Sequence, residues 1–201
     1  MKSFLLGLIL GLIALPLAAY VYFQTGHPPV AVADKPFPME QQIVSVPLQA
    51  RIESEMTGTA PIHVTAANLQ AGARIYGQQC AACHGSYDRP SSFAKHMYPQ
   101  APQLWERHGR KNAVGVSDDP PGETYWKIAN GIRLTGMPSF DKILDPTQMW
   151  QVTLLLSRAN QPLPADVQSL IKRPAAVNDA ALTHPHPAAS APKLAAAANG
   201  K

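Results

Sequence analysis

The stretch Cys80-Ala81-Ala82-Cys83-His84 is the most informative part of this chain. Two thiols three residues apart at a helix end can straddle one edge of a porphyrin and add to its two vinyl groups. The imidazole that follows directly can bind iron on one face of the ring. The motif therefore predicts covalent attachment of a c-type haem.

Three other roles for the two cysteines are weaker. A thioredoxin-type redox pair would need alternating strands and helices, which the surrounding sequence lacks. A structural zinc site would need a second pair of ligands, and the chain has 2 cysteines in all. A single structural disulfide is possible in an exported protein, but it does not explain the histidine at position 84.

A haem that only carries electrons needs a sixth iron ligand, and a thioether is a soft neutral donor that raises the reduction potential. Met137 lies in the sequence Leu134-Thr135-Gly136-Met137-Pro138-Ser139-Phe140. Gly136 gives this loop backbone freedom, and Pro138 favours an extended Met137. We therefore favour Met137 over the other candidate donors, which are Met97, Met149, His96 and His108. Met149 is expected to fill the core, because it lies on an apolar helical face.

Three helices are predicted around these motifs. They cover residues 69–79, 123–130 and 145–156, and the third ends before Pro162. Asp145, Pro146 and Gln148 resemble an N-cap, a proline at the first helical position and a capping box. Gly72 and Tyr76 share a face of the first helix. This face is expected to cross the third helix near Trp150 or Leu154.

Residues 68–160 resemble a class I c-type cytochrome domain, since a helix, CAACHG, a variable loop, a helix, the GMPSF loop and a last helix follow in order. The resemblance implies an all-α fold around one covalent haem c. It implies thioether bonds at Cys80 and Cys83, with His84 and Met137 as axial ligands of the iron. The run from Asn130 to Pro138 is similar to that of membrane-bound monohaem cytochromes that serve as respiratory-complex subunits.

The two ends of the chain differ from this domain. Residues 4–23 contain twenty uncharged residues, which is the length of a transmembrane helix. We favour a retained anchor over a cleaved signal peptide, because the A-x-A sequence at Ala31 lies far beyond the apolar run. The predicted organisation is an anchor (1–23), a proline-rich extended tether (24–64), the cytochrome domain (65–161) and an Ala/Pro-rich tail (162–201).

The loop between residues 85 and 122 is longer than a minimal cytochrome needs. Leu104 and Trp105 are expected to pack at the haem edge, and the alternative is a docking surface that uses Arg107, Arg110 and Lys111.

The composition agrees with an electron carrier. The chain has 201 residues, 20 prolines and a formal charge of +4 without a basic run, so we expect no nucleic-acid partner. We expect electron transfer at a bacterial inner membrane, with the haem domain on the periplasmic side. Other electron-transfer proteins, or subunits of a respiratory or photosynthetic complex, would be the partners. Two alternatives are a haem domain whose labile distal methionine serves gas sensing or peroxide chemistry, and a structural subunit.

Overall fold

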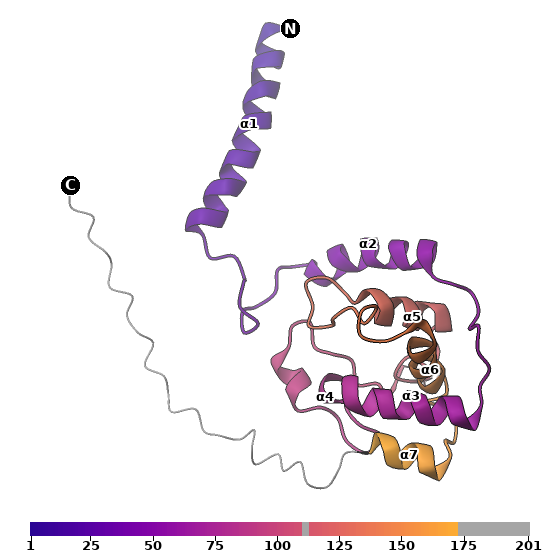
Figure 1. Cartoon of the computed structure of the whole chain (residues 1–201). Helices are drawn as coiled ribbons and strands as arrows, with labels where there is room; N and C mark the ends of the chain where they lie inside the picture. The colour runs from indigo at the N-terminus through magenta and orange to yellow at the C-terminus, as the bar shows by residue number, and fades with distance from the viewer. Residues whose placement is uncertain (110–112, 173–201) are drawn as a thin grey trace, which may run out of the picture.

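The computed structural model describes residues 1–109 and 113–172, and its fold is mainly helical (Figure 1). The helices are α1 (Lys2–Thr25), α2 (Glu40–Glu55), α3 (Ala66–Gln79), α4 (Ala81–His84), α5 (Pro121–Asn130), α6 (Pro146–Ser157) and α7 (Ala165–Ile171), with a 3-10 helix η1 (Phe93–His96). Two short strands, β1 (Arg107–His108) and β2 (Ala113–Val114), pair antiparallel, with Arg107 opposite Val114. The all-α expectation is confirmed, apart from this small hairpin.

Helices α3 and α6 cross at the centre of the domain. The capping box predicted at the start of α6 is present, since Asp145 accepts from the Gln148 amide at 2.9 Å and Gln148 returns the bond. At the crossing, a methyl group on Gly72 would lie 2.7 Å from the backbone carbon of Gln151. The predicted crossing is therefore correct, but its register is wrong: Gly72 faces the Gln151 backbone, whereas Trp150 stacks on Tyr125 of α5.

Helix α7 was not predicted, because residues from 162 onward were expected to form a tail. Leu163, Val167 and Ile171 are all buried and belong to the main hydrophobic core. Asp166 also accepts a hydrogen bond from Gln70 of α3 at 2.5 Å. The folded unit thus continues to residue 172, and the predicted tail from 173 to 201 lies outside the described residues.

Helix α2 corrects the prediction of an extended tether over residues 24–64. Its Ile52 is fully buried, and its Glu55 accepts a hydrogen bond from the Trp126 indole of α5 at 2.9 Å. Pro47 lies inside the helix on an exposed surface, where water can bond to the carbonyl that proline leaves without a partner. This part of the segment is therefore helical and docked on the domain.

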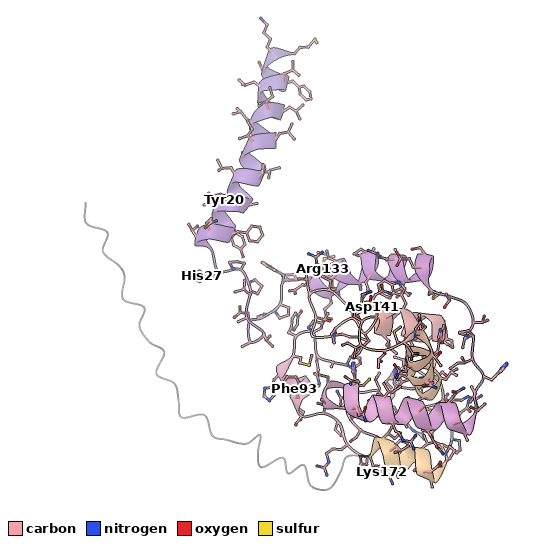
Figure 2. All side chains as sticks on the ribbon, in the orientation of Figure 1. Tyr20, His27, Phe93, Arg133, Asp141 and Lys172 are labelled. Atoms are coloured by element: carbon pink, nitrogen blue, oxygen red, sulfur yellow. The ribbon has the colours of Figure 1, made fainter. Side chains whose placement is uncertain are left out.

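Helix α1 stands apart from the folded domain (Figure 1). Its length and composition would allow it to cross a membrane, and its side chains, Tyr20 among them, are exposed in the structure (Figure 2). Only length and composition support this role, which a signal sequence would satisfy as well.

Candidate haem-binding site

The Cys80–His84 motif begins where α3 ends. Cys80 terminates α3 and also starts the single turn of α4, which contains Cys83 and His84. Tyr76, fully buried one turn earlier, donates a hydrogen bond to the Gly85 carbonyl at 2.7 Å. The motif is therefore fixed at both ends, by helix α3 before it and by the Tyr76 hydroxyl after it.

The His84 ring is oriented by a backbone carbonyl. Its Nδ1 lies 2.8 Å from the Pro102 oxygen, and a carbonyl can only accept, so Nδ1 carries the proton. This leaves the Nε2 lone pair available to a metal. Burial lowers the pKa of His84, while the hydrogen bond to Pro102 has the opposite effect. The neutral, iron-binding form is thereby favoured.

The long loop after the motif supports the α4 turn through polar side chains. Ser91 donates to the Ala82 carbonyl at 2.5 Å, and the Gln103 amide donates to the Cys83 carbonyl at 3.3 Å. The Gln103 oxygen also accepts from the Ser91 amide at 2.6 Å. These bonds close a ring of contacts that keeps the motif rigid.

The environment of Cys80 disfavours thiolate chemistry. Both cysteines are free thiols in the structure. Burial, together with a smaller contribution from the nearby Cys83, raises the pKa of Cys80 to about 12. Thiol–disulfide exchange and zinc binding both need a thiolate. The burial of Cys80 thus weighs against the redox-pair and zinc alternatives.

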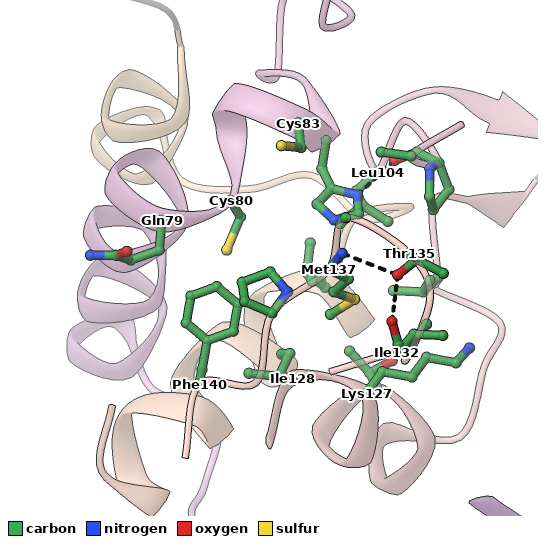
Figure 3. Close-up of a pocket in the computed structure, with 18 of the residues that line it drawn as sticks. Gln79, Cys80, Cys83, Leu104, Lys127, Ile128, Ile132, Thr135, Met137 and Phe140 are labelled. Carbon is green, nitrogen blue, oxygen red and sulfur yellow. Dashed lines mark hydrogen bonds between the residues drawn. The ribbon is translucent and has the colours of Figure 1, made fainter. Parts of the chain in front are cut away.

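The loop that contains Met137 is tied together by hydrogen bonds to Thr135. The Thr135 hydroxyl donates to the Ile132 carbonyl at 2.7 Å and accepts from the Met137 amide at 3.1 Å, as the dashed lines in Figure 3 show. The Ile132 amide donates to the Met137 carbonyl at 3.2 Å. Gly131 opens the loop with φ 66° and ψ −174°, a conformation that is essentially restricted to glycine.

One apolar cavity brings the four predicted site residues together. It has a volume of about 1170 Å³ including its open mouth, and Cys80, Cys83, His84 and Met137 all line it. Figure 3 shows the two cysteines and Met137 around the same cavity, with Phe140 and Ile128 in its wall. Further apolar lining comes from Leu104, Ile132, Leu144, Val152 and Leu156. Such a cavity suits a flat, largely apolar cofactor.

Met97 also lines this cavity, which the sequence analysis did not expect. A methyl group on Gly136 would collide with the terminal carbon of Met97. Met97 therefore packs on the loop that contains Met137, against the open side of Gly136.

The other predicted residues have different places. Met149 is buried in the core, as expected. Leu104 is buried and lines the cavity, as expected. Trp105 packs edge-on against Tyr76 and Tyr87 and is not among the residues that line the cavity, so its predicted place at the haem edge is not confirmed. His96 is exposed, and His108 makes a hydrogen bond to the Gly115 carbonyl. Arg110 and Lys111 of the alternative docking surface lie outside the described residues.

Sequence reasoning missed the residues that orient the ligands. Pro102 acts through its backbone oxygen, which every residue type offers, so no sequence signal marks it. Gln103 and Ser91 are ordinary loop residues whose roles depend on tertiary contact. Thr135 could have been found, because a hydroxyl two residues before Met137 can bond to its amide.

The fold and this site define a class I c-type cytochrome domain. Residues 67–155 match the family model "Cytochrome C oxidase, cbb3-type, subunit III". These residues therefore form a cytochrome c domain of the cbb3 type, a class that implies electron transfer and a covalently bound haem c. Helices α2 and α7 lie outside the matched range.

The other comparisons add little to this assignment. No curated protein matches the chain. Among solved structures, the chain is similar to part of the reducing HAO-like protein complex of Kuenenia stuttgartiensis, with 22% sequence identity and a TM-score of 0.36. The similarity covers 58% of this chain and 49% of the other, so it spans about half of that protein's length.

Proposed function

We propose that this protein is a membrane-anchored, monohaem c-type cytochrome that transfers electrons. In this proposal Cys80 and Cys83 form the thioether bonds, and His84 and Met137 are the axial iron ligands. The observation that supports it best is the presence of these four side chains around one apolar cavity. The oriented His84 ring, the protonated Cys80 thiol and the apolar walls fit a covalently held porphyrin.

The residues of the chain would set the properties of this centre. The haem, when bound, supplies one-electron chemistry at its iron. The Pro102 carbonyl would hold the His84 tautomer, and the Thr135 bonds would direct Met137. The apolar walls would exclude water, which disfavours the more highly charged oxidised state.

Two protein ligands on the iron leave no position open for a substrate, which favours a carrier over a catalyst. The anchor α1 would hold the domain on the periplasmic side of a bacterial inner membrane. There the domain would pass electrons to or from other subunits of a respiratory or photosynthetic complex. The similarity of residues 67–155 to an oxidase subunit supports this type of partner.

Carbon monoxide binding tests the ligand assignment. We expect the reduced wild-type protein to bind carbon monoxide little, because Met137 occupies the sixth position. A Met137→Leu variant should lose the methionine–iron absorption band and bind carbon monoxide readily. Rapid binding by the wild type would favour a labile ligand and the sensory or peroxide-reactive alternative instead.

Met97 supplies the matched control, since it is a second methionine of the same cavity. A Met97→Leu variant should keep the methionine–iron band. Loss of the band in Met97→Leu, with its retention in Met137→Leu, would overturn the assignment. Intact mass of the holoprotein should show the addition of one haem.

A further inference from the structure

The outer face of α2 is an apolar stripe that is largely exposed in the described structure. Ile43 and Val46 are 65% and 68% exposed, and Pro47 and Ala50 are exposed beside them. Positions 43, 46, 47 and 50 follow the i, i+3, i+4, i+7 spacing of one helical face. The opposite face contains Ile52, which is fully buried against the domain. The helix is thus apolar on two sides, and only one of them is covered by the protein.

The charged residues of α2 avoid this stripe. By helical position, Glu40 and Arg51 lie along one border of the stripe and Glu53 along the other. Glu55 points to the domain, where it bonds to Trp126. A neutral stripe of this kind argues against a charged partner and requires an apolar surface to cover it.

The position of α2 relative to α1 favours the membrane as the surface that covers the stripe. α1 ends at Thr25 and α2 begins at Glu40, so only a short connection separates them. Figure 1 shows α2 lying across the direction of α1, on the side of the domain from which α1 extends. The connection itself exposes further apolar side chains, namely Val30, Val32, Phe37 and Met39. Exposed apolar side chains therefore occur along the connection between the anchor and α2, interrupted by the exposed Asp34 and Lys35.

We propose that α2 is an interfacial helix that lies in the plane of the bilayer surface, with Ile43, Val46, Pro47 and Ala50 in contact with lipid. The proposal rests on α1 being a membrane anchor, as stated under the proposed function. Because Ile52 and Glu55 fasten α2 to α5, a bound α2 fixes how the domain faces the membrane. The haem cavity then keeps one orientation instead of swinging on a loose tether.

Spin labels on the full-length holoprotein test this. The protein is reconstituted in vesicles of phosphatidylethanolamine and phosphatidylglycerol, and a single label is attached at Val46→Cys or, as control, at Gln49→Cys. Gln49 is exposed on the same helix but lies to the side of the stripe. In the holoprotein, where Cys80 and Cys83 are thioethers, the introduced cysteine is the only thiol.

Oxygen concentrates in the bilayer and the nickel complex stays in water, so the ratio of the spin label's accessibility to oxygen and to the nickel complex reports contact with lipid. We expect this ratio to be several-fold higher at position 46 than at position 49. Adding Ile43→Ser should remove most of this difference. Equal ratios at the two positions, in protein that floats with the vesicles, would refute the interfacial role of α2 alone. Protein that does not float would refute the anchor and with it the proposal. Labelling at more than one site would instead show that the haem is not attached as proposed.

Discussion

Two glycines of the Met137 loop should respond very differently to the same substitution. Gly131 has a positive φ of 66° with an extended ψ, and such a conformation costs an alanine about 1–3 kcal/mol. Its new methyl group would lie 2.6 Å from backbone atoms of Pro138 and Ser139, about 1 Å inside normal contact. Forcing this backbone apart adds about 1–3 kcal/mol. We therefore expect Gly131→Ala to lower the free energy of unfolding by about 2–6 kcal/mol.

The second glycine, Gly136, has no such backbone constraint. An alanine methyl there meets only the terminal carbon of Met97, which can rotate away. The expected loss for Gly136→Ala is about 1 kcal/mol or less. The atoms displaced in Gly131→Ala belong to residues directly after Met137, so this variant should also bind carbon monoxide more readily than the wild type.

The assay is guanidinium unfolding of the two holoproteins in detergent, followed by far-ultraviolet circular dichroism, with carbon monoxide binding measured separately. Equal losses of stability in the two variants would contradict the assignment of strain to Gly131. Wild-type stability in Gly131→Ala would refute it outright.

Three further predictions concern the packing of the helices and their titrating groups. Gly72→Ala pushes α3 away from the Gln151 backbone and should lower the free energy of unfolding by about 2 kcal/mol. In Gly77→Ala the new methyl group would lie 3.1 Å from the Leu170 carbonyl oxygen, so the change measured by urea unfolding should be about 1 kcal/mol or less. Burial raises the pKa of Asp119, so the folded state binds its proton more tightly than the unfolded state. The free energy of unfolding should therefore fall as pH rises from the ordinary pKa of 3.8 through the higher folded pKa. Asp119→Asn should flatten this slope in a pH series of unfolding curves. The Trp126 hydrogen bond lowers the pKa of Glu55, so the stability that Glu55 contributes is present above pH 4.5 and is lost as pH falls through the lower folded pKa. Glu55→Ala removes the acceptor and should speed amide exchange in α2 at neutral pH, and unchanged exchange would show that the bond does not hold the helix.

The parts of the fold that could be predicted are those with short-range signals. The Cys80–His84 spacing is a local chemical requirement, and the capping box at Asp145 is contained within four residues. Gly72 allowed the helix crossing to be predicted, because a glycine inside a helix usually has a packing reason such as close approach of another helix. The residue of α6 that faces Gly72 could not be predicted, since the register of α6 depends on the packing of the whole core.

Helices α2 and α7 were missed for a different reason. Helix α2 contains Pro47, and α7 directly follows Pro162 and Pro164, so their sequences did not favour helices. Short helices are also marginal without tertiary contacts. Ile52 on α5 and Val167 beneath α3 supply those contacts. Sequence composition describes only the isolated segment, so it predicted a tether and a tail. The ligand-orienting Pro102 carbonyl was invisible for the same reason, because tertiary folding alone brings it to His84.

Helix α7 has a practical consequence for anyone who defines the limits of this domain. The family match ends at residue 155, yet Val167 and Ile171 are fully buried twelve and sixteen residues later. A protein shortened to the matched range would expose the α3 surface that these side chains cover, and apolar surface of this kind promotes aggregation. The Tyr87 amide, which donates to the Ile171 carbonyl at 3.0 Å, would also lose its partner next to the haem-attachment motif. The boundary of the stable unit is therefore set by the side chains that pack under α3, which lie beyond the range matched by the family model.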